Sequence, residues 1–194
     1  MKNLYLILEF CPNGDLSTHL QERNRFTESV AGFYIAEVIL SIEYLHQRDI
    51  VYRDLKPENI LVDALGHVCL ADFGLAKDDV NMANMAMSFW GSPAYLPPEM
   101  LGQGGTDKPA DIYCIGAILF ELLAGYPPYY SDNMDTLFKN IQTANLQYPK
   151  YVKAHAKDLI NALLCRDPNL RPTIDEIKLH PFFDIIDWDL LEKR

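Results

Sequence analysis

Apolar residues recur at the spacing of an α-helix after Thr27. They lie three or four positions apart and form one apolar face over about four turns; its members are Ala31, Ile35, Val38, Ile42 and Leu45. The run His46-Gln47-Arg48 follows this face, and basic residues suit the negative end of a helix dipole. We therefore predict a long helix that ends near His46, with no ligand role for that histidine.

A second helix is expected at about residues 111–124, as the hydrophobic centre of the fold. One apolar stripe runs along it, made of Ile112, Ile115, Leu119 and Leu122. Gly125, followed by Pro127-Pro128, gives this helix a clear C-terminal stop. Further helices are expected from Leu16, at 135–142 and at 152–164, where Val152, Ala156, Leu159 and Leu163 share a face.

Short β-branched runs bounded by polar residues predict a few strands. Residues 3–10 are expected to form one buried strand, and residues 49–51 and 60–62 two more. Another apolar stretch, 68–71, comes just before Asp72. The expected fold class is therefore mainly α with a few short β-strands.

A charged loop, residues 52–59, separates two of these predicted strands. It contains Asp54, Lys56 and Asn59, and Asp72 follows ten residues after the next strand. Loops held by rigid strands are common positions for reactive groups. Two carboxylates and an amide beside strands form an oxygen-ligand site suited to Mg²⁺ and phosphate.

Composition narrows the classes of partner. The formal net charge is −10 over 194 residues, which disfavours nucleic acid and anionic membranes as partners. An acidic protein can bind a basic peptide, although many acidic faces are simply solvated. The four cysteines show no CxxC spacing, and three of them are expected in the core. Without a recognisable signal or membrane span, we expect a cytoplasmic, intracellular protein, with the nucleus left open.

Three motifs occur in order: Asp54-x4-Asn59, Asp72-Phe73-Gly74 and Pro97-Pro98-Glu99. This set resembles the protein-kinase signature, and the resemblance covers almost the whole chain. It implies a partial kinase domain over 1–194, with a hinge strand at 3–10, a large C-terminal lobe at 16–183 and the start of a C-terminal tail at 184–194. Lys56 and Ser92 resemble the serine/threonine branch. The segments His180-Pro181-Phe182-Phe183 and Ile186-Asp187-Trp188 resemble the AGC group of these kinases.

The resemblance implies a role for each residue of the loop. Asp54 would accept or orient the proton of the substrate hydroxyl, Lys56 would steady the transferring phosphoryl oxygens, and Asn59 and Asp72 would hold Mg²⁺. The implied contacts to ATP come from Glu9, Cys11, Asp15, Glu58, Leu61 and Asp72. From the residues alone, 3–16 is better described as a strand, a turn and a helix capped by Asp15.

Further roles implied by the resemblance are structural. Asp111 would bond the backbone of the catalytic loop, although an acid in the first turn of a helix is also favoured by the dipole. Arg171 would pair with Glu99. Two departures, Tyr52 in place of the usual His and Pro97 in place of Ala, remove no reactive group.

Residues 77–89 have no hydrophobic period, and the resemblance makes them an activation loop. Ser88 would be its phosphosite, modified by an upstream activating kinase and contacted by Arg53 and Lys77; the alternative is a surface serine. Glu58 and Glu121 would present carboxylates to an arginine of a basic substrate, and their alternative is ordinary loop and helix acids. Ala94 lacks an acid that some such relatives carry.

No glycine-rich loop, phosphate-pairing lysine or partner glutamate precedes Asn3, so the small lobe is essentially absent from this sequence. Either the chain is a fragment of a complete kinase, or it is a natural large lobe. The expected function is ATP-dependent phosphorylation of serine or threonine in proteins. By itself the chain is expected to be inactive. The alternative is an inactive lobe that binds peptides or partners, and a small-molecule phosphotransferase is a distant third.

Overall fold

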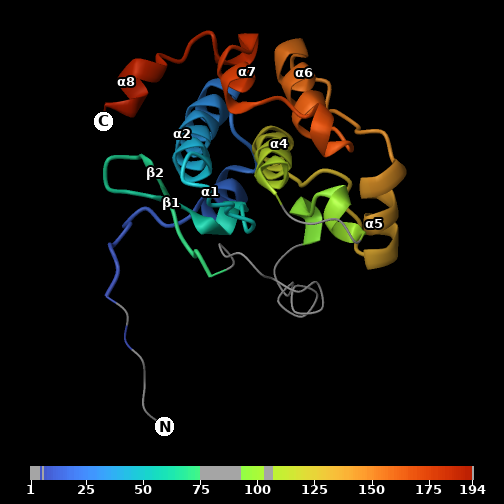
Figure 1. Cartoon of the computed structure of the whole chain (residues 1–194), viewed down its shortest axis with the longest axis horizontal. Helices are drawn as coiled ribbons and strands as arrows, with labels where there is room; N and C mark the ends of the chain where they lie inside the picture. The colour runs from blue at the N-terminus through green and yellow to red at the C-terminus, as the bar shows by residue number, and fades with distance from the viewer. Residues whose placement is uncertain (1–4, 6, 75–92, 103–106, 194) are drawn as a thin grey trace.

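The computed structural model describes residues 5, 7–74, 93–102 and 107–193, and within them the fold is mostly helical. Two central helices, α2 (Glu28–His46) and α4 (Lys108–Ala124), pack against each other (Figure 1). Around them lie α1 (Leu16–Arg23), α5 (Met134–Thr143), α6 (Ala154–Leu163), α7 (Ile174–Lys178) and α8 (Trp188–Glu192). The fold class expected from the sequence is confirmed.

Helix α4 is the centre of the core, as its apolar stripe predicts. Ile115, Leu119 and Leu122 are fully buried, and Ile112 is 5% exposed. Asp107 caps the first turn, and Gly125 ends the helix in the left-handed region at φ 89°. Gly116 lets α6 approach, because a Cβ at this position would lie 2.6 Å from Cβ of Leu163. Adding one methyl group at Gly116 would therefore push two core helices apart.

Helix α2 buries the whole apolar face that its spacing predicts. Thr27 caps its start by accepting a hydrogen bond from the backbone N–H of Val30, and His46 is its last residue. Its other described neighbours include β2 and α7. The position of His46 at the end of α2 brings its ring to the start of α4, which matters for the site below.

One small antiparallel sheet contains β1 (Ile60–Val62) and β2 (Val68–Leu70). In its register Leu61 lies opposite Cys69, and a turn with Gly66 at φ 90° connects the strands. The chain before α1 adds an isolated bridge on the other side of β1, between Asp15 and Leu61. This bridge places Leu61, which follows the loop 52–59, next to Asp15, which precedes α1.

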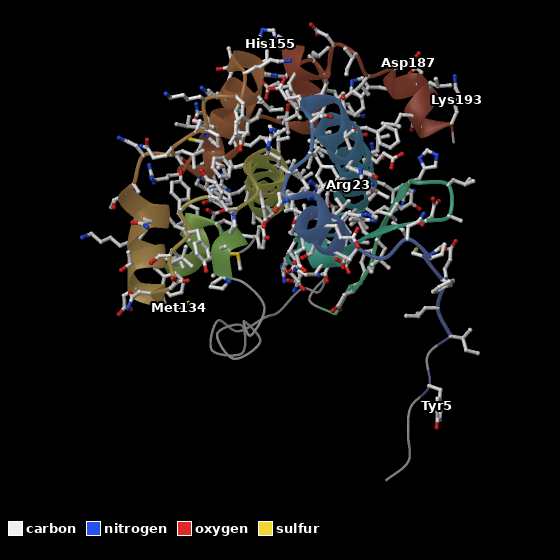
Figure 2. All side chains as sticks on the ribbon, turned by 180° about the vertical axis from the view of Figure 1, so that it is seen from behind. Tyr5, Arg23, Met134, His155, Asp187 and Lys193 are labelled. Atoms are coloured by element: carbon white, nitrogen blue, oxygen red, sulfur yellow. The ribbon has the colours of Figure 1, made fainter. Side chains whose placement is uncertain are left out.

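Two predicted strands are wrong. Among the described residues of the first, Tyr5 and 7–10 have no strand pairing, and Ile7 is fully exposed (Figure 2 shows Tyr5 standing away from the helical body). A strand that is apolar on both faces needs neighbouring strands and a covering layer, and the described residues supply neither here. Residues 49–51 form a turn and loop instead, because the N–H of Ile50 bonds the carbonyl of Leu45 at the end of α2.

Cysteine burial also differs from the expectation. Cys114 is buried, but Cys11, Cys69 and Cys165 are each partly exposed, and all four are free thiols. Among the described residues, no helix has the length and apolar character that crossing a membrane requires.

Candidate active site

Asp111, in the first turn of α4, holds the backbone of the loop that carries Asp54. Its carboxylate is fully buried and accepts from the N–H of Tyr52 at 2.9 Å and from the N–H of Arg53 at 2.8 Å. Nε2 of His46 lies 2.8 Å from the same carboxylate. Arg53 adopts a φ of 69°, a strained conformation for a residue with a side chain. These hydrogen bonds give that conformation its support, as the sequence predicted for Asp111.

The three predicted catalytic residues come together around one carboxylate. Nζ of Lys56 lies 2.9 Å from each carboxylate oxygen of Asp54. Nδ2 of Asn59 donates to the backbone carbonyl and to Oδ2 of Asp54, both at 2.8 Å. Asp54 is therefore fixed by one cation and one amide, while its side chain keeps 18% of its surface exposed. A partly exposed, oriented carboxylate is what a base for a bound hydroxyl requires.

The segment with Asp72 lies against the same loop. The N–H of Ala71 donates to the carbonyl of Asn59 at 2.9 Å, and the hydroxyl of Tyr52 donates to the carbonyl of Ala71. The ring of Phe73 meets the ring of Tyr52 edge-on, with centroids 5.3 Å apart. Burial raises the pKa of the Tyr52 phenol, and the carboxylates of Asp54, Asp72 and Asp111 raise it further. Tyr52 thus replaces the usual His as a buried connection between the two segments.

The donor set fits a hard divalent cation. Both amide hydrogens of Asn59 face Asp54, so its amide oxygen is turned the other way. Asp72 is exposed, and its carboxylate accepts only the N–H of Gly74 among the printed side-chain contacts of the described residues. One amide oxygen and one carboxylate, with room for water and phosphate oxygens, match the preference of Mg²⁺. No cluster of three His, Cys, Asp or Glu residues occurs in the described part of the chain.

Three of the predicted nucleotide contacts lie beside the hairpin. Asp15 pairs with Leu61 through the backbone, and Cys11 begins the turn that ends at Gly14. The carboxylate of Asp15 accepts from N–H and Oγ1 of Thr18, so it caps α1 as the alternative reading expected. Glu9 is exposed in the described segment 7–10.

Glu121 is not the solvent-facing helix acid that its alternative reading describes. It accepts a hydrogen bond from the hydroxyl of Tyr95, which is 7% exposed. Burial raises the pKa of Glu121 to about 7, the Tyr95 hydrogen bond lowers it, and the nearby carboxylate of Glu58 raises it. Glu58 itself is exposed. The two predicted substrate acids therefore lie within electrostatic reach of each other.

Arg171 and Glu99 form the predicted bidentate pair. Nη1 lies 2.6 Å from Oε1 and Nη2 lies 2.7 Å from Oε2. Nη1 and Nε of Arg171 also donate to the backbone carbonyls of Pro109 and Cys165, each at 2.8 Å. The Arg171 side chain is only 1% exposed, so this pair ties three separate segments together inside the protein.

Ser88, Lys77 and Ser92 lie outside the described residues. The sequence also missed contacts that depend on distant partners. His46 meets Asp111, and the fully buried Glu37 accepts from Nδ1 of His67 at 2.6 Å and from the N–H of Val68 at 2.7 Å. No local pattern predicts the partners of these residues. The one available signal is that Glu37 is an acid on the apolar side of a helix.

Comparison with known proteins agrees with this geometry. A protein kinase domain model matches residues 1–183, so the chain belongs to the protein kinase family. Within that family it belongs to the serine/threonine, AGC-like group, as the resemblance implied. It is 44% identical to the serine/threonine-protein kinase SCH9 of Candida albicans over 99% of this chain and 25% of that protein. It is 43% identical to a cAMP-dependent protein kinase catalytic subunit of Schizosaccharomyces pombe over all of this chain and 38% of that protein.

The chain spans only part of such relatives. It covers 22% of "Protein kinase 3" and 40% of "Protein kinase 2" of Dictyostelium discoideum, each of which is 41% identical to it. The family is therefore established for this chain, while the activity of a whole protein is a matter for proposal.

Proposed function

We propose that this chain is the catalytic lobe of an intracellular kinase that transfers phosphate from ATP to serine or threonine in proteins. The observation that carries the proposal is the grouping of Lys56 and Asn59 on the Asp54 carboxylate, with Asp72 against the same loop. Phosphoryl transfer depends on positioning and charge neutralisation more than on covalent steps. The buried Asp111 and the partly exposed, oriented Asp54 supply that positioning.

Each side chain has one task in this proposal. Asp54 accepts the proton of the attacking hydroxyl. The ammonium group of Lys56 stabilises the negative charge on the oxygens of the transferring phosphoryl group. Asn59 and Asp72 would hold Mg²⁺, which would neutralise charge on the phosphates. The backbone at Glu9 and Cys11 would meet the adenine, Leu61 would lie beside it, and Asp15 and Glu58 would face the remaining nucleotide.

The proposal is tested by joining this chain to a small lobe of the same family and assaying transfer from ATP to a serine peptide. We expect activity from the joined protein and little from the 194 residues alone, because nothing then closes over ATP or excludes water. Peptide binding without transfer in the joined protein would favour the alternative of an inactive binding lobe. Transfer to a small molecule but not to peptides would favour the third class.

We also propose that Glu58 and Glu121 bind an arginine of the substrate. Glu121 loses its proton near pH 7, and a guanidinium binds the charged form better. The KM for a peptide with arginine before the acceptor should therefore fall as pH rises from 6 to 8, by roughly 10-fold or less. Glu121→Gln should remove most of this pH dependence of the KM. Glu22→Gln, at an exposed position of α1, should keep it.

The pH dependence of folding stability provides a control that does not involve the substrate. The folded-state pKa of Glu121 lies above its ordinary 4.5, so its contribution to stability is present below that value and is lost as pH rises through about 7. Glu121→Gln should remove this loss whatever the substrate is. If Glu121→Gln changes the stability profile but leaves the arginine preference and its pH dependence intact, the substrate role is wrong.

A further proposal concerns activation by an upstream kinase at Ser88. A phosphate there adds nearly two negative charges and accepts hydrogen bonds from Arg53 and Lys77, which would order the loop against Asp54. In the joined enzyme Ser88→Ala should lower activity at least about 10-fold. Arg53→Ala keeps the backbone N–H that Asp111 accepts, and it should add little to the Ser88 loss because both act through one contact.

Thr143→Ala, an exposed hydroxyl at the end of α5, serves as the control and should leave activity unchanged. Full activity of Ser88→Ala, or strictly additive losses in the double variant, would contradict the switch. The cytoplasmic location, with the nucleus left open, is also a proposal, and imaging of the full-length protein in its own cells tests it.

A further inference from the structure

Two partly exposed cysteines, Cys11 and Cys69, lie together beside the hairpin. The turn from Cys11 to Gly14 is closed by a hydrogen bond from the N–H of Gly14 to the carbonyl of Cys11 at 3.3 Å. Past that turn, the carbonyl of Gly14 accepts from the N–H of Val62 at 2.8 Å, and Asp15 pairs with Leu61. Leu61 in turn lies opposite Cys69. The backbone thus places the turn at 11–14 beside β1, the strand that pairs with β2.

Residues that lie opposite each other in an antiparallel ladder point to the same face of the sheet. The side chains of Leu61 and Cys69 therefore share one face, and the turn that begins at Cys11 leads directly to Asp15, the residue that pairs with Leu61. Burial raises the pKa of the Cys69 thiol, and the neighbouring Cys11 thiol raises it further. Cys69 thus keeps its proton to higher pH.

We propose that Cys11 and Cys69 are an oxidisable dithiol that forms an intramolecular disulfide with peroxide. The Cys11 sulfur attacks one oxygen of hydrogen peroxide, the O–O bond breaks, and Cys11 becomes a sulfenic acid as one water leaves. The Cys69 sulfur then displaces the hydroxyl from Cys11, loses its proton, and a second water leaves. Two thiols and one peroxide thus give one disulfide and two waters.

Two features favour a disulfide over the other uses of paired thiols. Both residues are partly exposed, which gives the oxidant access, whereas Cys114 is buried and inert by comparison. A metal site needs further ligands, and no group of three suitable residues occurs in the described part of the chain. The remaining partly exposed thiol, Cys165, follows α6 and does not belong to the hairpin.

The bond would act on the nucleotide site, and this consequence rests on the proposed function. Cys11 is one of the residues whose backbone would meet the adenine, and Leu61 lies between Asp15 and Cys69 in the sheet. Joining residue 11 to β2 would fix the turn and place two sulfurs beside Leu61. We expect the oxidised protein to bind ATP at least about 10-fold more weakly, a difference that a shift of 1.4 kcal/mol produces.

The first test does not involve ATP. The 194-residue chain is treated with hydrogen peroxide in native buffer, the remaining thiols are alkylated, and disulfide-linked peptides are mapped by mass spectrometry. We expect the Cys11–Cys69 peptide pair to dominate, and to disappear in Cys11→Ser and in Cys69→Ser but not in Cys165→Ser. A parallel oxidation in urea should lose this preference, because pairs 69 with 114 and 114 with 165 close shorter loops. The same mixture of pairs in urea and in native buffer would overturn the proposal.

The second test measures the KM for ATP of the joined enzyme before and after oxidation. It should rise at least about 10-fold on oxidation and return with dithiothreitol, whereas oxidation should leave it unchanged in Cys69→Ser. A mapped disulfide with unchanged KM would refute the effect on nucleotide binding while the thiol site stands. A reduced enzyme that neither binds nor uses ATP would refute the proposed function, and the mapping result would be unaffected.

Discussion

Asp54→Asn should reduce phosphoryl transfer by the joined enzyme by about 10²- to 10⁴-fold and leave its fold intact. Asparagine has the size of aspartate but cannot take the proton of the attacking hydroxyl. It also loses the charge that Lys56 meets at 2.9 Å. The measurement is initial rate with a serine peptide at saturating ATP, and the melting temperature gives the structural readout.

The fold should survive because the loop is held elsewhere. The N–H groups of Tyr52 and Arg53 donate to Asp111, and this contact does not involve the Asp54 side chain. Asp72→Ala should cause a loss of similar size, but through weaker use of Mg²⁺, so its deficit should shrink at high magnesium concentration. Asp132→Asn, an exposed aspartate before α5, is the matched control and should keep full activity. Normal rates with Asp54→Asn would remove Asp54 from the mechanism.

Arg171→Ala should cost about 3–5 kcal/mol of stability, because it leaves the Glu99 carboxylate without its cation inside the protein. The alanine variant also frees the carbonyls of Pro109 and Cys165. For a domain of this size such a loss lowers the melting temperature by roughly 6–20 °C. Thermal unfolding followed by circular dichroism measures it, and poor soluble expression would be an early sign.

Arg166→Ala is a fitting control for this experiment. Arg166 is exposed, and its Nε and Nη2 donate to the carbonyls of Ile141 and Ala144, with no acidic partner among the printed contacts of the described residues. We expect it to cost about 1–2 kcal/mol, because two hydrogen bonds are lost but no buried charge is left without a partner. Adding Glu99→Gln to Arg171→Ala should recover part of the loss, because the stranded charge is then gone. A melting temperature unchanged by Arg171→Ala would mean that the pair does not support the fold.

Local pattern predicted the longer helices and the strands β1 and β2, but it missed the short helices α7 and α8 and predicted two strands that the described residues do not form. The stripes of α2 and α4 lie on the buried faces that their spacing predicts, since a helix satisfies its own backbone and needs only one covered side. A strand takes its hydrogen bonds from other segments, so residues 7–10 and 49–51 could not be judged from their own composition.

The site shows the same division. Asp54, Lys56, Asn59, Asp111 and the pair of Glu99 with Arg171 were named from the family resemblance, and spacing alone would not have paired residues so far apart in sequence. The contacts of His46 with Asp111 and of Glu121 with Tyr95 were not predicted, because the partners come from other segments. The partners of a side chain depend on the tertiary structure, and the spacing of apolar residues along one helix does not predict them.

The anchoring of the loop by Asp111 has a consequence for how such an enzyme could be divided. The contacts described for Tyr52, Arg53 and Asp54 come from α4, from the segment with Ala71 and Phe73, and from the loop itself, all within this chain. Segments of this chain therefore set the geometry around Asp54. A small lobe supplied as a separate polypeptide could then restore transfer by association alone, which would make this chain one half of a split enzyme whose output reports how closely two tethered proteins meet.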